Sequence, residues 1–231
     1  MEQSYRFMRI VNRIGGGIRV VRSFLGRELS QSPTGDPVTV LDIGAADCDL
    51  PLAIARWAAR RGHRIEFTCL DHDPKAVELA ERAVARQVGW GLPHQGFGGA
   101  SPAPPAVKVV QADIFTYRPA EPFDYAVGSM TFHHFTDDQI DTLITHLRGF
   151  VRRAVLINDL HRCLLNYLVC WVLALPLNSE IRHDALLSIR RGFKPHELAG
   201  QLAKHDPDAT ARRMWFCRVA GVVRFDRRGQ V

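Results

Sequence analysis

The sequence lacks several features that would assign it to a familiar class. Its five cysteines are an odd number and none forms a C-x-x-C pair, which argues against a disulfide framework and against a zinc site. The charge-free stretch Leu164–Leu177 is too short to span a bilayer and contains Pro176. The N-terminus has no apolar core of the signal-peptide type. These absences predict a cytoplasmic protein without a metal.

The composition is that of an ordinary packed protein with a basic balance. The chain has 231 residues, of which 46% are hydrophobic, a length and a share that fit one domain over residues 1–231. The net charge of +6 permits an anionic partner such as RNA or a lipid surface. Because the arginines are spread along the chain, a solvated basic surface is the favoured explanation.

Strand-like and helix-like segments alternate from Val38 to Asp159, which predicts a parallel sheet covered by helices on both faces. The tail RRMWFCRVAGVVRF is rich in β-branched and aromatic residues and predicts a closing antiparallel hairpin. The fold class is therefore α/β, doubly wound and Rossmann-like. The expected strands are VTVLDI, IEFTCL, VKVVQA, FDYAVGSM and VRRAVLIND.

Two further segments are expected to be helical. Residues 1–36 carry apolar residues at three- and four-residue steps, interrupted by Gly15–Gly17, and predict an N-terminal helical cap. Residues 160–195 predict a helical insertion on the side of the sheet where an acceptor would bind. The segment Gly89–Ala106, rich in Gly and Pro, predicts a loop between these two regions.

The loop after the first strand, LDIGAADCDL, raises the question of the ligand. In doubly wound sheets ligands bind beyond the carboxyl ends of the strands, and a glycine such as Gly44 lets the backbone approach them. Ala46 and Cys48 stand where further glycines are usual. Asp71 follows the second strand, where a carboxylate can accept both hydroxyls of a ribose, and Asp113 follows the third, where it could accept an adenine amine.

The charge of this loop distinguishes between adenosine cofactors. Asp42, Asp47 and Asp49 would repel a pyrophosphate but suit a cation. S-adenosylmethionine carries a sulfonium and an ammonium, so the pattern favours it over NAD or FAD. An NAD-dependent reductase is further disfavoured by the missing second and third glycines.

Five motifs in register resemble those of class I S-adenosylmethionine-dependent methyltransferases: VLDIGAADCDLPLAIA, CLDHDPKAVELAERA, VVQADIF, FDYAVGSMTFHHF and VLINDLHR. They are most similar to the small-molecule branch that includes the ubiquinone/menaquinone-biosynthesis methyltransferases. The resemblance implies a seven-stranded sheet ending in an antiparallel hairpin, with S-adenosylmethionine as cofactor. It places the cofactor contacts at Asp42, Gly44, Ala46, Asp71, Asp113 and Ser129, to which we add the neighbours Ala45, His72 and Ile114.

Three histidines are candidate catalytic residues, because an imidazole suits a general base near neutral pH. His161 follows the fifth strand and is the leading candidate as base or as a residue that orients the acceptor. His133 and His134 follow the fourth strand. Packing within FHHF, or capping and packing of the next helix by His161, would explain the same residues.

The acceptor is expected to be an apolar or aromatic small molecule, methylated at a hydroxyl oxygen or, failing that, at carbon. Tyr167 and Trp171 would form an apolar wall, unless their helix belongs to the core, and Arg190 could bind an acidic or phenolate acceptor, unless it is solvated. Two other functions stay open: an RNA methyltransferase, although the fourth strand ends in GSMT instead of an NPPY-type sequence, and a catalytically inactive binding protein. The basic N-terminal helix is also compatible with a membrane surface, and the oligomeric state is left open.

Overall fold

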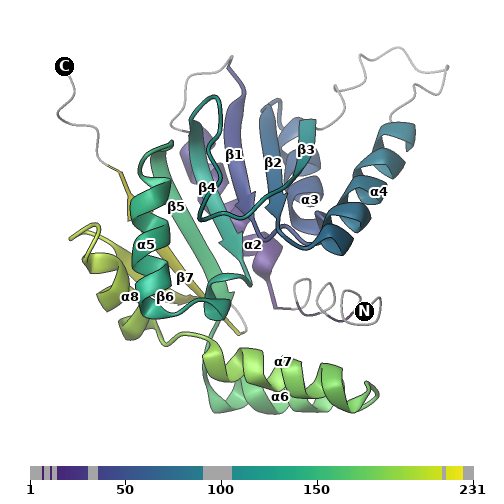
Figure 1. The fold of residues 1–231 in the computed structure, drawn as a ribbon, viewed down its shortest axis with the longest axis vertical. Helices are drawn as coiled ribbons and strands as arrows, with labels where there is room; N and C mark the ends of the chain where they lie inside the picture. The colour runs from purple at the N-terminus through teal and green to yellow at the C-terminus, as the bar shows by residue number, and fades with distance from the viewer. Residues whose placement is uncertain are drawn as a thin grey trace.

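The protein is built on a seven-stranded sheet, seen in a computed structural model that describes residues 7, 11, 15–30, 36–90, 106–214 and 217–225 (Figure 1). The strand order is β3-β2-β1-β4-β5-β7-β6. The strands are β1 (Val38–Ile43), β2 (Ile65–Asp71), β3 (Ala106–Gln111), β4 (Phe123–Ser129), β5 (Val151–Leu160), β6 (Thr210–Met214) and β7 (Arg218–Arg224).

Strands β1 to β5 are parallel, and β7 pairs antiparallel with both β5 and β6. The strand order reverses at β1 and β4, so the carboxyl ends of these two strands form the switch point where ligands bind in such sheets. This architecture confirms the expected Rossmann-like fold, including the closing hairpin.

Helices cover both faces of the sheet, as Figure 1 shows. One face carries α2 (Gly17–Ser30), α3 (Asp49–Ala59) and α4 (Pro74–Trp90), and the other carries α5 (Asp137–Leu147) and α8 (Pro195–Ala203). The strands alternate between two hydrophobic clusters because successive side chains of a strand point to opposite faces. On β1, Val40 joins the first cluster and Leu41 the second.

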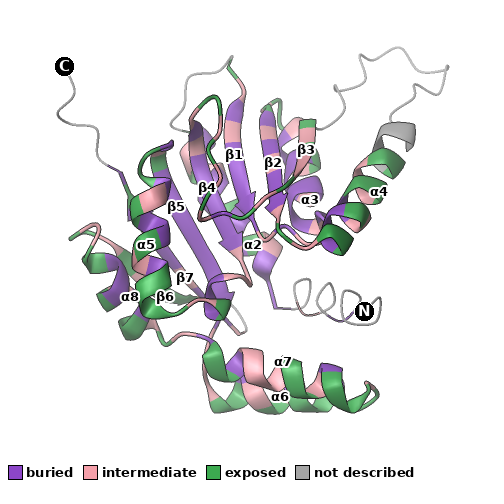
Figure 2. Cartoon of the chain, viewed as in Figure 1, coloured by how far each residue is buried: buried purple, intermediate pink, exposed green. Residues whose placement is uncertain are grey.

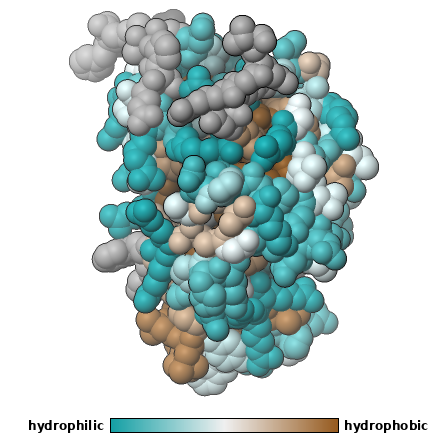
Figure 3. Space-filling model, turned by 90° about the vertical axis from the view of Figure 1, so that its left-hand side faces the viewer, coloured by the Kyte–Doolittle hydropathy of each residue, from teal (hydrophilic) through white to brown (hydrophobic). Residues whose placement is uncertain are grey.

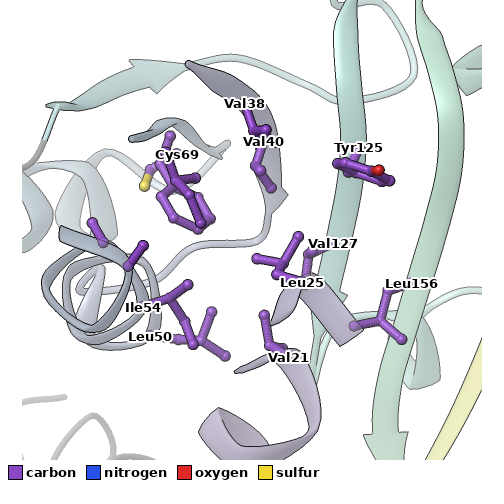
Figure 4. Close-up of a cluster of buried hydrophobic side chains, with 14 of the residues drawn as sticks. Val21, Leu25, Val38, Val40, Leu50, Ile54, Cys69, Tyr125, Val127 and Leu156 are labelled. Carbon is purple, nitrogen blue, oxygen red and sulfur yellow. The ribbon is translucent and has the colours of Figure 1, made fainter. Parts of the chain in front are cut away.

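The first cluster joins α2 and α3 to the sheet (Figure 4). Val21 and Leu25 of α2 meet Ile54 of α3 and Val127 of β4, and each of these side chains is at most 1% exposed. Tyr125 donates its hydroxyl to Glu28 at 3.0 Å, which fixes α2 to the sheet by a polar contact as well.

The remaining helices, α6 (Leu164–Ala174) and α7 (Ser179–Arg191), lie side by side beyond the strand ends, below the sheet in Figure 1. Much of their surface is exposed, in contrast to the buried strands (Figure 2). They occupy the segment 160–195, which the sequence predicts to be helical; the division into one domain with a cap and an insertion stays a prediction. In the described part of the chain, no helix is long and apolar enough to cross a membrane.

The helix ends follow local rules with one exception. Thr136 and Gln139 form a capping box at the start of α5. Asp73 accepts from the backbone N–H of Lys75 at 3.0 Å, just before α4 begins. The residue before α3 is Cys48, and its side chain makes no capping hydrogen bond.

The expected N-terminal helix is interrupted at its glycines. Gly16 has a φ of +76°, and α2 starts at the next residue. Of the residues before Gly15, the structure describes only Phe7 and Val11, so most of the predicted cap lies outside the described residues. The same holds for most of the expected Gly89–Ala106 loop.

Candidate active site

The loop between β1 and α3 holds three residues in the left-handed backbone conformation. Gly44 has a φ of +68°, Ala46 of +47° and Cys48 of +58°. Ala46 and Cys48 are the positions where the sequence lacks the usual glycines, so they adopt a glycine conformation with a side chain present. This conformation costs an L-residue about 1–2 kcal/mol.

Gly44 makes room for the loop that follows β4. A Cβ atom at Gly44 would lie 2.6 Å from the Thr131 Oγ1 atom. That hydroxyl donates a hydrogen bond to the Ile43 carbonyl at 2.9 Å. The glycine therefore permits close contact between two loops at the switch point, in addition to the approach of a ligand that the sequence suggests.

Asp71 ties the end of β2 to the glycine loop. Its Oδ2 atom accepts from the Ala46 N–H at 3.0 Å, and its Oδ1 atom accepts from the Asp73 N–H at 3.1 Å. The structure thus brings together three residues of the predicted cofactor set: Gly44, Ala46 and Asp71. Ala45 is buried in the same loop.

The other predicted contacts after β2 and β3 lie nearer the surface. The His72 side chain is 87% exposed, with Nδ1 3.7 Å from the Asp71 Oδ1 atom. Asp113 is exposed and accepts from the Phe115 N–H at 2.9 Å, while Ile114 is buried. These positions border the crevice without a direct contact to the glycine loop.

Asp42, at the end of β1, is a buried carboxyl in an unfavourable electrostatic position. Burial, and then the neighbouring charge of Asp71, raise its pKa to about 8. A buried carboxylate of this kind is stabilised when a cation approaches it. The ammonium of an amino-acid ligand would meet that need.

Asn158, at the end of β5, belongs to the same crevice although the sequence-based site did not include it. Its Nδ2 group donates to the Ser129 Oγ atom at 2.9 Å and to the Gly17 carbonyl at 3.2 Å. Its Oδ1 atom is buried and finds no hydrogen-bond partner among the described residues. A free acceptor beside Ser129, together with Asp42, fits a ligand that carries an ammonium, as S-adenosylmethionine does. The sequence signal was an amide at the end of an apolar strand.

A cavity of about 220 Å³ lies beyond the ends of β4 and β5. Its lining includes Phe7 and Val11 from the N-terminal segment, Met130 after β4 and Leu160 at the end of β5, and the inner face of α7 closes it. Most of these side chains are apolar. The cavity is therefore suited to an apolar molecule at the place where the sequence predicts the acceptor.

His133 is one of two histidines that line the cavity, and it is held by a buried carboxylate. Its Nδ1 atom lies 2.7 Å from the Asp159 Oδ1 atom, and its backbone N–H donates to Oδ2 at 3.1 Å. Burial alone would raise the pKa of Asp159, but the charge and hydrogen bond of His133 and the N–H of Leu160 hold it below its usual value. Asp159 therefore orients His133.

His134 lies next to His133 at the cavity, with the ring centroids 4.1 Å apart. Partial burial, and then the charge of His133, lower the pKa of His134 to about 4. His134 is therefore a neutral imidazole at physiological pH. It remains exposed and adds a polar edge to an otherwise apolar wall.

His161 lies apart from these two histidines. Its backbone N–H donates to the Cys217 carbonyl at 2.9 Å, and its Nδ1 atom is buried without a hydrogen-bond partner in the described part of the chain. Burial, and then the charge of Arg213, lower its pKa. The ring does not line the cavity, so the structure favours His133 and His134 over the leading sequence-based candidate.

The three predicted acceptor residues are also not part of the lining. Trp171 is 45% exposed and lies on the outer side of α6. Tyr167 packs in a small hydrophobic cluster under α7, and its hydroxyl accepts from Arg190 at 3.2 Å. Cys170 is the residue by which α6 reaches the cavity. Within the described ranges, His, Cys, Asp and Glu side chains form no group of three that could hold a metal ion.

No protein-family model and no curated protein matches this sequence. Solved structures do. The plantazolicin methyltransferase BpumL, in complex with S-adenosylhomocysteine, matches with a TM-score of 0.65 and 12% identity over 96% of this chain and 90% of its own. The magnesium protoporphyrin IX methyltransferase ChlM from Synechocystis PCC 6803, also with S-adenosylhomocysteine, matches with a TM-score of 0.62 and 12% identity over 97% and 95%.

The mitomycin 7-O-methyltransferase MmcR matches with a TM-score of 0.52 and 18% identity over 94% of this chain and 57% of its own. At these identities the likeness concerns the fold. The chain has the Rossmann-like fold that these class I methyltransferases share.

Proposed function

We propose that this protein is an S-adenosylmethionine-dependent methyltransferase that methylates a hydroxyl oxygen of an apolar or aromatic small molecule. The observation that carries the proposal is the cavity beyond β4 and β5, in which a histidine fixed by a buried aspartate faces apolar walls. A phenol or quinol would fit this chemistry, in keeping with the ubiquinone/menaquinone branch that the motifs resemble.

S-adenosylmethionine supplies an electrophilic methyl group on a sulfonium when it is bound. We assign its amino-acid portion to Asp42 and Asn158, because a buried carboxyl with a raised pKa and an unpartnered carbonyl oxygen are complementary to an ammonium. We assign its ribose side to Asp71, which accepts from the Ala46 N–H of the glycine loop with Oδ2 and from the Asp73 N–H with Oδ1. Neighbours of the same fold that contain S-adenosylhomocysteine support this assignment.

His133 is assigned the role of general base. Because its Nδ1–H donates to Asp159, the ring keeps its proton on Nδ1 and leaves Nε2 as the acceptor. A base in this position removes the proton of an acceptor hydroxyl as the oxygen becomes a nucleophile. Such assistance contributes about 10²–10⁴-fold to a rate.

The remaining contribution comes from positioning. A displacement at a methyl group needs the acceptor oxygen held in line and close, and a fixed cavity provides this. Asp184 and Ser188 of α7 supply polar groups among the apolar lining, so they are candidates for orienting the acceptor. His134, neutral at physiological pH, adds a hydrogen-bonding group without a charge.

The first test is calorimetric titration of the purified protein with S-adenosylmethionine and S-adenosylhomocysteine. We expect micromolar binding that is lost in the Asp71→Ala variant. Absence of binding at millimolar ligand would contradict the cofactor assignment and favour a binding protein that retains the fold.

The second test measures transfer of a labelled methyl group to a panel of phenols and quinols. In His133→Asn, the amide nitrogen can still donate to Asp159 while no base remains, so we expect kcat to fall about 10²–10⁴-fold with cofactor affinity unchanged. His161→Asn is the matched control, and its rate should stay within a few-fold of the parent. A larger fall in kcat for His161→Asn than for His133→Asn would instead indicate His161 as the base.

A further inference from the structure

The exposed large hydrophobic residues of this protein gather on one short segment. Among the residues that the structure describes, all seven lie between Leu164 and Leu175, on and just after α6. In Figure 3, hydrophobic side chains accordingly gather at the bottom of the molecule, where Figure 1 places α6 and α7. The seven residues are Leu164, Leu165, Leu168, Trp171, Val172, Leu173 and Leu175, exposed by 36% to 73%. We refer to them as the α6 face.

Helix α6 is apolar on both its sides, although only one side is used by the fold. Asn166, Cys170 and Ala174, spaced four residues apart, are buried against the rest of the molecule. The Asn166 Nδ2 group donates to the His161 and Cys217 carbonyls at 2.9 and 3.3 Å, which fixes the start of the helix. Leu168 and Val172, also four apart, point the other way. A helix held in this manner presents a permanent apolar surface to its surroundings.

Cationic side chains border this surface. The eleven residues of α6 contain no charge. The Arg190 guanidinium carbon lies 5.4 Å from the Tyr167 ring centroid on the flank of α6, while Arg162, two residues before the helix, forms a salt bridge with Glu197. Residues 160–194 contain five arginines and lysines against two acidic residues. The α6 face thus combines exposed leucines and a tryptophan with an arginine beside them, and membrane binding of such a surface scales with its buried apolar area and with attraction to anionic lipids.

We propose that the α6 face binds the surface of an anionic lipid bilayer, with the α6 axis in the plane of the membrane. A stable protein–protein interface needs roughly 20–30 residues from each partner, whereas the α6 face offers seven from one helix. A second copy of the chain is therefore a poorer match than a lipid surface. α6 is also too short to cross the bilayer, so the contact is peripheral.

The location gives the contact a use, which rests on the proposed function. Cys170 of α6 lines the cavity from the inner side of the same helix whose outer side would meet the lipid. Docking by the α6 face would hold the acceptor cavity within one helix diameter of the bilayer, about 10 Å. An apolar acceptor dissolved in the membrane would then have a short path to His133.

The test is sedimentation of the full chain with vesicles of phosphatidylcholine alone and with added phosphatidylglycerol. We expect binding to the anionic vesicles, weaker binding to the neutral ones, and a loss of about tenfold or more in partitioning for Leu168→Glu/Val172→Glu. Ala120→Glu/Thr142→Glu changes the charge equally at exposed positions on other elements and should keep most of the binding. Equal losses in both double variants would overturn the proposal, because they would reflect net charge alone.

Two further measurements separate lipid from other occupants. Brominated acyl chains should quench tryptophan fluorescence in the parent and less in Trp171→Phe. Light scattering without lipid should give a monomer; a dimer that Leu168→Glu/Val172→Glu dissociates would assign the face to a second copy. A large fall in melting temperature in that variant would show that the face is covered within the chain. None of these readouts needs methyl transfer, so failure of the lipid contact and failure of the proposed function are distinguishable.

Discussion

Asp42 and Asp159 are both buried aspartates near the carboxyl ends of parallel strands, yet their pKa values shift in opposite directions. Asp159 has its partner within the chain, since His133 lies 2.7 Å away, and its pKa is held below the usual range. Asp42 lies near another carboxylate, Asp71, and its pKa is raised to about 8.

The difference is between a carboxylate that is paired within the chain and one whose charged neighbour is another carboxylate. A buried charge persists in a folded protein when it is paired, and is costly when it is not. Under the proposed function, the acceptor side of the site would be complete in the chain alone, whereas the cofactor side would be completed by the ammonium of the ligand. Five predictions test this comparison and the loops around it, in order of decreasing effect.

Replacing Asp159 by alanine should destabilise the protein by about 3–5 kcal/mol, since it removes the carboxylate whose charge acts on the buried Arg218 and leaves the His133 N–H groups without their acceptor. Chemical denaturation at pH 7 measures this loss. His133→Asn, which retains a donor for Asp159, should cost much less. Equal losses in the two variants would mean that packing, and not the His133–Asp159 contact, holds these two residues in place.

Replacing Asp42 by asparagine should change the free energy of unfolding in the opposite direction and stabilise the protein. Because the folded-state pKa is raised from 3.8 to about 8, the parent is penalised progressively as the pH rises from about 4 to about 8. At pH 7 the variant should be more stable by on the order of 4 kcal/mol, while its affinity for S-adenosylmethionine should be lost. Denaturation curves at pH 5 and pH 8 check the sign, and a variant that is less stable at pH 8 would contradict it.

The same carboxyl predicts how cofactor affinity depends on pH. The ligand's ammonium binds the ionised carboxylate, so affinity should rise up to about tenfold per pH unit toward pH 8 and fall again above it, where an α-ammonium, with a usual pKa of about 8, loses its proton. Titration from pH 6 to pH 9 measures the profile, with proton release expected at pH 7. A flat profile in the parent would show that Asp42 does not meet the ammonium.

Ala46→Gly should stabilise the loop by up to about 1 kcal/mol, because glycine adopts a positive φ without strain. Cys48→Gly is the matched comparison: it relieves the same strain but removes a fully buried side chain, so its net effect should be smaller or unfavourable. Thermal unfolding of the two variants side by side gives the answer. A lower melting temperature for Ala46→Gly would mean that packing of the alanine methyl stabilises the protein by more than its backbone strain costs.

His134 gives the smallest effect. Its pKa is lowered to about 4, so the folded protein resists its protonation and loses stability as the pH falls from about 6.5 toward 4. His134→Gln should flatten that part of the stability profile slightly, since the exposed ring is partly screened by solvent. His183→Gln, at an exposed position on α7, should leave the profile unchanged.

The sequence predicted the parts of the site that are contiguous in the chain. Strand periodicity located β1 to β5, and the carboxylates after β1 and β2 followed directly from the strand ends. The acceptor cavity could not be predicted in this way, because its walls come from the N-terminal segment, the loop after β4 and α7. Which of the three histidines faces the cavity depends on where the end of β5 lies relative to the turn after β4.

The position of Trp171 could not be predicted from the sequence either. Its helix was expected to wall the acceptor, and helical spacing alone does not say which side of an apolar helix faces inward. In the structure Cys170 faces the cavity and Trp171 faces away. Burial on both sides of α6 would have given the same sequence pattern.

The hydrogen bond from Thr131 to the Ile43 carbonyl has a consequence for ligand binding. Thr131 stands directly before the short helix that carries His133 and His134, and it rests on Gly44 of the cofactor loop. A ligand that fixes the conformation of the glycine loop therefore also fixes the turn that carries the two histidines. Under the proposed function, binding of the methyl donor at the glycine loop should therefore strengthen binding of the acceptor through this contact.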